Sequence, residues 1–396
     1  MKIAPQTSEP SDTSQLRLSV SLSDEPIAAN YSDVLLPTHL LSGSAACLTI
    51  QNSLEAPVVD FYARPSKKFR YRLVEAGFLL ATARETASEP AKETASEQNF
   101  AGIGETNPRN AFPDPARERR QRQLEVCHAL GESLEAIHAG SLIIDDIQDQ
   151  SAERRGSPTL HKKFGVPLAL NAGNWLYFKA FELIRKLVSQ HQITDATELR
   201  LYRLCHQVML DAHVGQAIDL GAHISEIGRN QVAEICLASL KLKTGALMAL
   251  ALGAGAVLAE ADEATLEMIL SIGADLGVSL QMFDDLGNIQ LELKNPKRFE
   301  DLYLKRPSWI WAAVAQNSSD REYAHFLTAV SELPREGRLI QWFHSNELLP
   351  KARRQALVFS NSVMSRFENH FSSGQTGTMA IHIVQTLLER IQISYG

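Results

Sequence analysis

The chain of 396 residues contains little cysteine: Cys47, Cys127, Cys205 and Cys236 are its only four, and none forms a Cys-x-x-Cys pair. A disulfide framework or a thiolate metal site uses more cysteines or closer spacing, so neither is expected. Two of the four precede a histidine, but adjacent residues of a helix point about 100° apart and rarely bind one ion together. We therefore predict buried, reduced thiols in a cytoplasmic protein.

The sequence also lacks an excess of positive charge and a long apolar run. Its formal net charge is −7, so binding to nucleic acid, which ordinarily needs a basic surface, is not expected. The longest uncharged segment, Thr244 to Ala259, has 16 residues, fewer than the roughly 20 that a membrane-spanning helix needs. Its alanines and glycines favour a helix buried in a protein core, and we predict no transmembrane segment.

Alternating patterns typical of β-strands are scarce, and the one β-like stretch runs from Ala46 to Ile50. Apolar residues instead recur at three- and four-residue spacing, which indicates amphipathic helices. This spacing predicts helices at 120–146, 167–189, 196–221, 229–258, 262–291 and 378–394. We therefore predict an all-α protein in which residues 31–396 form a single large helical bundle.

Two segments have the composition of unstructured chain. Residues 1–30 are rich in Ser, Thr, Asp and Pro, which predicts a disordered leader. Residues 85–117 contain a repeated Glu-Thr-Ala-Ser-Glu followed by several glycines and prolines. This low-complexity composition predicts a surface insertion between two helices.

The most informative segment is an apolar helical pattern that ends in the acidic cluster Asp145-Asp146-x-x-Asp149. A helix places Asp145 and Asp149 on one face, with Asp146 about 100° round. Such carboxylates repel one another unless cations lie between them, and Mg²⁺ prefers oxygen ligands that it can bridge to phosphates. An acidic helix end in solvent gives the same pattern. However, Arg154 and Arg155 follow closely, and arginine binds phosphate oxygens well, so a metal and anion site is favoured.

A second acidic cluster, Asp284-Asp285-x-x-Asn288, lies further along the chain. If it faced the first across a bundle, the two would form a carboxylate-lined mouth over an apolar interior. Weaker signals accompany them: a basic turn with Lys67 and Arg70, Gly-Gln-x-x-Asp-Leu at 215–220, and Lys-Thr-Gly at 243–245. On residue chemistry alone, the sequence indicates a helical, Mg²⁺-dependent enzyme that acts on diphosphates.

The order of these motifs resembles that of the trans-isoprenyl diphosphate synthases, the polyprenyl synthetase family, over roughly residues 61–310. Lys-x-x-Arg, DDxxD, RRGxPxxH, GQxxDL, KTG and a glutamine-containing second acidic motif follow one another. Residues 138–178 resemble the animal and fungal type of geranylgeranyl diphosphate synthase. The resemblance implies the isoprenoid synthase fold with a central active-site cavity, a homodimer, and a transferase that joins isopentenyl diphosphate to an allylic diphosphate.

The resemblance also assigns roles to individual residues. About three Mg²⁺ ions would be present with substrate bound. Their ligands would be Asp145, Asp146, Asp149 and Asp284. The allylic diphosphate would also contact Arg154 and Lys243. The diphosphate of isopentenyl diphosphate would contact Lys67, Arg70, His138 and Arg155. Beside the reacting carbons would lie Lys243, Thr244 and Gln281. A loop at 300–306 would close over the site through Lys305 or Arg306, and the sequence does not choose between them.

Product length depends on the helical turn that lies below the first acidic cluster. Ser141 and Gly140, four and five residues before Asp145, are both small and would leave the pocket open at that depth. We therefore predict a product longer than fifteen carbons, with twenty as the main expectation and twenty-five as the alternative.

Two other functions fit part of the pattern. A terpene cyclase on the same fold would need the acidic clusters but no site for isopentenyl diphosphate, whereas Lys67, Arg70, His138 and Arg155 are all present. A non-catalytic subunit of a prenyl synthase would be expected to lose acidic ligands, whereas both clusters are intact. Chain elongation is therefore the favoured hypothesis.

Overall fold

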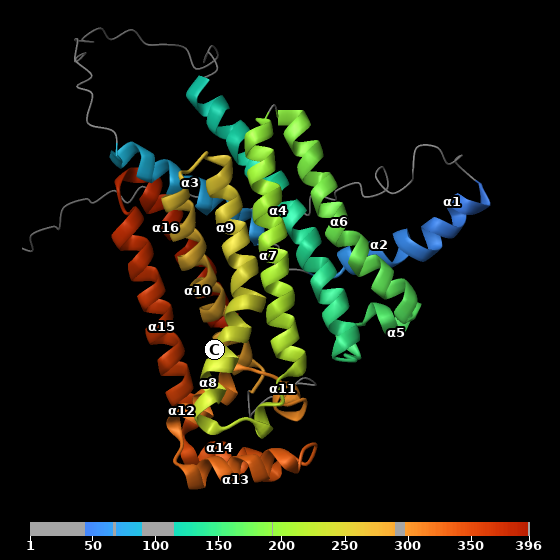
Figure 1. Cartoon of the computed structure of the whole chain (residues 1–396), viewed down its shortest axis with the longest axis vertical. Helices are drawn as coiled ribbons and strands as arrows, with labels where there is room; N and C mark the ends of the chain where they lie inside the picture. Colours follow the sequence, from blue (N-terminus) through green and yellow to red (C-terminus); the bar gives the residue numbers. More distant parts are fainter. Residues whose placement is uncertain (1–43, 66–68, 89–114, 192, 290–297, 395–396) are drawn as a thin grey trace, which may run out of the picture. The chain divides into compact units, whose positions relative to one another are not determined.

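The computed structural model describes residues 44–65, 69–88, 115–191, 193–289 and 298–394, most of which are helical (Figure 1). The chain divides after Glu55 into two compact units. In the first unit, the described residues form α1 (Ala45–Ile50) and the π-helical turn η2 (Gln51–Glu55). The prediction of a β-like stretch at 46–50 was wrong, because Ser44 caps a helix there by accepting a hydrogen bond from the Cys47 N–H at 3.2 Å.

The second unit begins at Ala56 and is a helical bundle with one short antiparallel hairpin. Its first half contains α2 (Ala56–Tyr62), α3 (Arg70–Ser88), α4 (Pro115–Gln148), β1 (Glu153–Arg154), β2 (Ser157–Pro158), α5 (Leu160–Phe164), α6 (Val166–His191) and α7 (Asp195–Gly221). Its second half contains η3 (Ile224–Glu226), α8 (Arg229–Leu240), η4 (Lys241–Gly245), α9 (Ala246–Leu258), α10 (Glu263–Gly287), α11 (Glu300–Tyr303), α12 (Trp309–Asn317), α13 (Asp320–Ser331), α14 (Gly337–Asn346), α15 (Leu348–Phe371) and α16 (Gly374–Ser394). The predicted all-α class is confirmed.

The helices predicted from apolar spacing are present, and their ends differ from the predicted ones by a few residues. The predicted leader at 1–30 lies outside the described residues. Most of the predicted insertion at 85–117 does so as well, and its two ends belong to α3 and α4. The four cysteines all belong to the described residues; they are buried and form no disulfide, as predicted.

α9 lies at the centre of the packing and contacts α3, α7 and α10. Each of its residues is buried except Leu247 and Leu258. Two segments, Arg229–Leu258 and Glu263–Gly287, are long and apolar enough to cross a membrane by length and composition, but 56% and 61% of their most apolar windows are buried among other helices. Burial of this extent is typical of core helices, which is what the sequence predicted for the apolar run within the first of them.

α3 and α9 approach so closely that a methyl group does not fit between them at two glycines. A Cβ atom placed on Gly255 of α9 would lie 1.9 Å from the carbonyl oxygen of Val74, and one on Gly77 of α3 would lie 1.9 Å from that of Leu252. Each helix therefore presents a glycine to the backbone of the other, and the missing side chains permit the close crossing.

Gly255→Ala is expected to lower the free energy of unfolding by about 1–3 kcal/mol, because α3 and α9 must separate to admit the methyl group. Gly337→Ala is the matched control, since no heavy atom lies within 4 Å of a Cβ placed there and alanine favours the helix that Gly337 begins. Urea and thermal unfolding measure both variants. Equal stability of the two variants would contradict the close crossing.

Candidate active site

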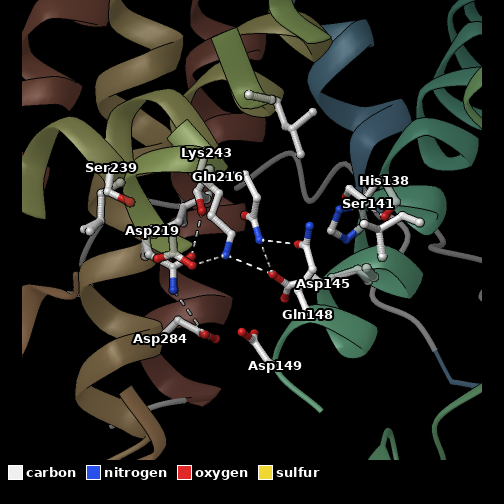
Figure 2. Close-up of a pocket in the computed structure, with 18 of the residues that line it drawn as sticks. His138, Ser141, Asp145, Gln148, Asp149, Gln216, Asp219, Ser239, Lys243 and Asp284 are labelled. Carbon is white, nitrogen blue, oxygen red and sulfur yellow. Dashed lines mark hydrogen bonds and ion pairs between the residues drawn. The ribbon is translucent and has the colours of Figure 1, made fainter. Parts of the chain in front are cut away.

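A cavity of about 930 Å³ lies within the second unit, lined mainly by α4, α6, α7, α8, η4 and α10 and by the segment that leads from α11 into α12. Three of the four aspartates predicted to bind metal line it: Asp145, Asp149 and Asp284. In Figure 2, Asp149, which directly follows α4, and Asp284 of α10 point toward each other. The two acidic clusters therefore share one cavity.

Asp146, the fourth of these aspartates, is turned away from the cavity. It is buried, and both of its carboxylate oxygens accept a hydrogen bond from Nε of Arg154 at 2.8 Å. A single step along a helix rotates the side chain by about 100°, which directs Asp146 toward the hairpin while Asp145 faces the cavity. In this structure Asp146 holds the Arg154 side chain.

Lys243 lies between carboxylates of two helices. Its Nζ donates hydrogen bonds to Asp145 Oδ1 of α4 and to Asp219 Oδ2 of α7, both at 3.0 Å (Figure 2). Gln216 of α7 adds a hydrogen bond from Nε2 to Asp145 Oδ1 at 3.1 Å. Although burial opposes its charge, the two carboxylates keep the pKa of Lys243 above its usual value. The ammonium therefore supplies the positive charge that these buried carboxylates need.

Glycines in the motifs allow the helices around Lys243 to meet closely. Lys243 belongs to η4, a π-helical turn of a kind that is frequent at functional sites. A Cβ atom on Gly215 of α7 would lie 2.6 Å from the Lys243 backbone nitrogen, and one on Gly277 of α10 would lie 2.6 Å from Gly245 Cα. The glycine of the Gly-Gln-x-x-Asp-Leu motif thus lets α7 bring Asp219 against Lys243.

The predicted reaction-centre residues Thr244 and Gln281 are hydrogen-bonded to each other. Thr244 Oγ1 donates to Gln281 Oε1 at 2.8 Å, and Gln281 Nε2 donates to Asp285 Oδ1 at 2.8 Å. Asp285 Oδ2 also accepts a hydrogen bond from the backbone N–H of Trp309 at 2.6 Å. Burial raises the pKa of Asp285 to about 7. Asp285 thus fixes the orientation of the Gln281 amide relative to the start of α12.

An arginine cluster, defined here as Arg70, Arg154 and Arg155, lines the cavity together with His138. Burial, and then the charges of these arginines, hold the pKa of His138 well below its usual value, so its imidazole is neutral. Its Nδ1 is buried and has no hydrogen-bond partner in the described part of the chain. Guanidinium groups gathered around a neutral imidazole form a site suited to a polyanion.

Arg70 and Lys67 are the basic residues of the Lys-x-x-Arg motif that are predicted to bind isopentenyl diphosphate. Arg70 is buried, and its Nη1 donates hydrogen bonds to both carboxylate oxygens of Glu135 at 3.0 and 3.1 Å. Glu135 also lines the cavity, so it balances part of the charge of the arginine cluster. Lys67 lies outside the described residues.

The two residues predicted to set product length occupy different environments. Ser141 lines the cavity, whereas Gly140 lies in the contact between α4 and α6. A Cβ atom on Gly140 would lie 2.7 Å from the Gly173 carbonyl oxygen and 3.2 Å from the Tyr177 ring. The expectation that both residues face the pocket is therefore corrected, because one helical step separates their directions.

The sequence predicts that either Lys305 or Arg306 serves the closing loop. Arg306 lines the cavity: its Nη2 lies 3.3 Å from Asp149 Oδ1, and its Nη1 donates to the Asp219 carbonyl oxygen at 3.0 Å. Lys305 instead contributes its carbonyl oxygen to the Ile224 N–H. Asp219 is a further site residue, which the Gly-Gln-x-x-Asp-Leu motif contains but does not by itself identify. Its importance comes from the contact with Lys243.

The carboxylates of the cavity fit Mg²⁺ in chemistry. Among the described residues, no group of three or more His, Cys, Asp or Glu side chains already surrounds a single metal position. Asp145 and Asp149 are instead paired with Lys243 and Arg306. Even so, burial, and then the charge of Asp145, raise the pKa of Asp149 to about 6. The site therefore needs more positive charge than its own side chains supply, and Mg²⁺ takes such carboxylate oxygens beside a diphosphate.

Comparison with known proteins shows that the chain belongs to the Polyprenyl synthetase family, whose sequence profile matches residues 110–341. It is 31% identical to a geranylgeranyl diphosphate synthase of Sulfolobus acidocaldarius over 165 aligned residues, and the aligned region covers 41% of this chain and 48% of that protein. It is 34% identical to a short chain isoprenyl diphosphate synthase of Methanocaldococcus jannaschii over 154 aligned residues, and the aligned region covers 39% of this chain and 44% of that protein. The chain thus spans about half the length of these curated relatives.

Other relatives match over longer regions. A geranylgeranyl pyrophosphate synthase of the fungus Epichloe festucae is 26% identical over 245 residues, which covers 61% of this chain and 69% of that protein. Among solved structures, the geranylgeranyl pyrophosphate synthetase of Pyrococcus horikoshii aligns with a TM-score of 0.62 at 20% identity, covering 88% of this chain and 91% of the other. The farnesyl diphosphate synthase of T. brucei aligns with a TM-score of 0.65 at 16% identity, covering 88% and 92%. These similarities confirm the isoprenoid synthase fold.

Asp145→Asn is expected to weaken the binding of Mg²⁺ in the presence of inorganic diphosphate by about tenfold or more, because it removes a charged oxygen ligand. Isothermal titration calorimetry measures the affinity. Asp275→Asn is a matched control, since Asp275 also pairs with two cations, Lys241 and Arg366, but lies outside the cavity. Equal affinity in the two variants would remove Asp145 from the metal site.

Proposed function

We propose that this protein is a prenyltransferase that joins isopentenyl diphosphate to an allylic diphosphate, releases diphosphate, and forms geranylgeranyl diphosphate. The observation that carries the proposal is that one cavity combines carboxylates from both acidic clusters, the arginine cluster with His138, and apolar walls. Membership of the Polyprenyl synthetase family and the similarity to several geranylgeranyl diphosphate synthases support it.

The acidic side of the cavity suits the diphosphate that leaves. Mg²⁺ bound by Asp145, Asp149 and Asp284 would supply positive charge that stabilises the departing diphosphate. Arg154 and Lys243 donate hydrogen bonds to the same group and so stabilise the negative charge that develops on it. Because Lys243 now shares its ammonium between Asp145 and Asp219, it turns from a carboxylate to the diphosphate when the substrate enters.

The reaction begins when the bond between the allylic carbon and the diphosphate oxygen breaks, and its electron pair leaves with the diphosphate. The allylic cation that remains must be kept from water, and Ile144, Leu247 and Met248 provide apolar surface in the cavity. The side-chain oxygens of Thr244 and Gln281 offer partial negative charge beside this cation.

The second substrate uses the other side of the cavity. Arg70, Arg155 and His138 hold the diphosphate of isopentenyl diphosphate, with the buried Nδ1 of His138 available to it. The double bond of isopentenyl diphosphate attacks the allylic cation and forms the new carbon–carbon bond. A proton then leaves the resulting cation, and the released diphosphate accepts it. The product is an allylic diphosphate that is five carbons longer.

Purified protein with Mg²⁺, isopentenyl diphosphate and each allylic starter in turn is expected to yield geranylgeranyl diphosphate as the main product, identified by chromatography and mass spectrometry. Removal of Mg²⁺ with a chelator should abolish turnover. A hydrocarbon formed from geranylgeranyl diphosphate alone would instead identify a cyclase. Inactivity that a second protein relieves would identify a non-catalytic subunit.

The same assay locates the end of the product pocket. Ser141→Phe should shorten the main product, because it fills the cavity one turn below Asp145. Tyr177→Ala should lengthen it, because the Tyr177 ring lines the cavity at the depth of this turn and packs edge to face against His213, with ring centroids 5.8 Å apart. Tyr202→Ala, on α7 outside the cavity, is the control and should leave product length unchanged.

A homodimer and a cytoplasmic location stay predictions. The proposal of a dimer is supported by exposed apolar side chains on α6, where Val166, Leu170 and Phe178 are 47%, 42% and 74% exposed and lie four and eight residues apart. Leu210 and Val214 of the neighbouring helix α7 are also exposed. Light scattering should give twice the chain mass of 43.8 kDa if this face binds a second copy.

A further inference from the structure

Arg64, which follows α2, contacts the hairpin of β1 and β2. Its Nη2 donates a hydrogen bond to the Pro158 carbonyl oxygen at 2.7 Å, and its Nη1 donates to the Arg154 carbonyl oxygen at 3.4 Å. Only 6% of the residue is exposed. One buried guanidinium thus joins the chain segment just before α3 to a hairpin that lies far away in sequence.

A carboxylate fixes this guanidinium in place. Arg64 Nη2 also donates to Asp60 Oδ1 at 2.6 Å, one turn earlier in α2. Asp60 accepts a second hydrogen bond from Lys163 of α5. Although burial opposes ionisation, the hydrogen bonds from Lys163 and Arg64 keep the pKa of Asp60 below its usual value. Asp60 is therefore charged at neutral pH and connects α2, Arg64 and α5.

The two arginines of the hairpin depend on this contact to different degrees. Arg154 has an anchor of its own, since its Nε donates to both oxygens of Asp146. Arg155 lies at the turn, where it and Gly156 have positive φ angles of 55° and 74°, as a two-residue hairpin turn of type I′ requires. Its guanidinium carbon lies 5.6 Å from the centroid of the Phe61 ring on α2. The position of Arg155 therefore depends on how α2 and the hairpin are held together.

Like charges oppose the arrangement. Burial, and then the charges of Arg154, Arg70 and Arg64, lower the pKa of Arg155. A hairpin that presents two arginines beside Arg70 would relax away from it unless other contacts restrained the backbone. The hydrogen bonds from Arg64 to the hairpin carbonyl groups supply such a restraint on both strands, one at Arg154 and the other at Pro158.

We propose that Arg64, held by Asp60, is a positioning residue for the second substrate: it fixes the hairpin so that Arg155 faces the diphosphate of isopentenyl diphosphate. This inference rests on the proposed function. It predicts a selective defect, because the allylic diphosphate is bound through Arg154 and Lys243, which keep their own partners when Arg64 is altered.

Arg64→Lys tests the inference, because lysine keeps the charge but cannot reproduce the fork of hydrogen bonds to Asp60 and the hairpin. The KM for isopentenyl diphosphate is expected to rise roughly tenfold, with the KM for the allylic diphosphate within about twofold of wild type. Asp60→Asn should change the same KM in the same direction. Arg338→Lys, which alters an exposed pair with Glu332, is the control and should change neither KM.

Hydrogen–deuterium exchange of the free protein gives a readout that does not need turnover. Backbone amides of residues 151–160 should exchange faster in Arg64→Lys than in wild type, while those of α9 stay unchanged. Equal rises in both KM values, a loss confined to kcat, or unchanged exchange in the hairpin would each overturn the inference. If the wild-type chain forms no elongated product, the proposed function fails, whereas the exchange measurement still tests the restraint by Arg64.

Discussion

The contact of Lys243 with Asp145 and Asp219 is the interaction on which the rest of the cavity depends. It joins α4, η4 and α7 at one point, and it balances carboxylates that are costly to bury without a partner. Gly215 has no side chain, which lets α7 approach η4 closely enough to make this contact, and Gly277 likewise lets α10 pack closely against Gly245 of η4. The metal-binding chemistry that we propose is an extension of it, because the cavity gathers more negative charge than the lysine alone can balance.

The cavity separates two kinds of charge. Carboxylates of α4 and α7 pair with Lys243, and carboxylates of α10 line the same cavity. The arginine cluster lines the cavity together with His138. The carboxylates, with Lys243 and Arg154, suit the diphosphate that must leave with an electron pair, whereas Arg70, Arg155 and His138 suit the diphosphate that stays attached to its carbon skeleton. Asp146 and Glu135 form ion pairs with Arg154 and Arg70 and so orient them. These two carboxylates give each guanidinium a defined position before substrate binds.

Much of the fold could be predicted from the sequence because the helices are long and their apolar spacing is regular. The core helix α9 follows from an uncharged, Ala- and Gly-rich run, and the placement of Asp145 and Asp149 on one face follows from helical geometry. Ala46 to Ile50 was mispredicted because a short apolar run has no period that distinguishes strand from helix, and the Ser44 cap decides it. Family motifs indicated where the site residues lie in the sequence, but not their partners.

What the sequence could not provide is the direction of each side chain across helices. Gly140 and Ser141 are adjacent, yet one contacts α6 and the other faces the cavity. The choice between Lys305 and Arg306 depends on how the segment before α12 turns, and no periodic pattern describes it. The role of Arg64 could not be predicted from the sequence either. Its hydrogen bonds go to the backbone carbonyl oxygens of Arg154 and Pro158, which lie about ninety residues away in the chain.

The most direct test of the account is a crystal structure of the protein with Mg²⁺ and a non-reactive thiolo analogue of an allylic diphosphate. The account predicts Mg²⁺ ions that bridge the diphosphate oxygens to Asp145 and Asp149 on one side and to Asp284 on the other, with Lys243 Nζ turned onto the diphosphate. A diphosphate bound elsewhere, or metal held by only one of the two acidic clusters, would contradict it.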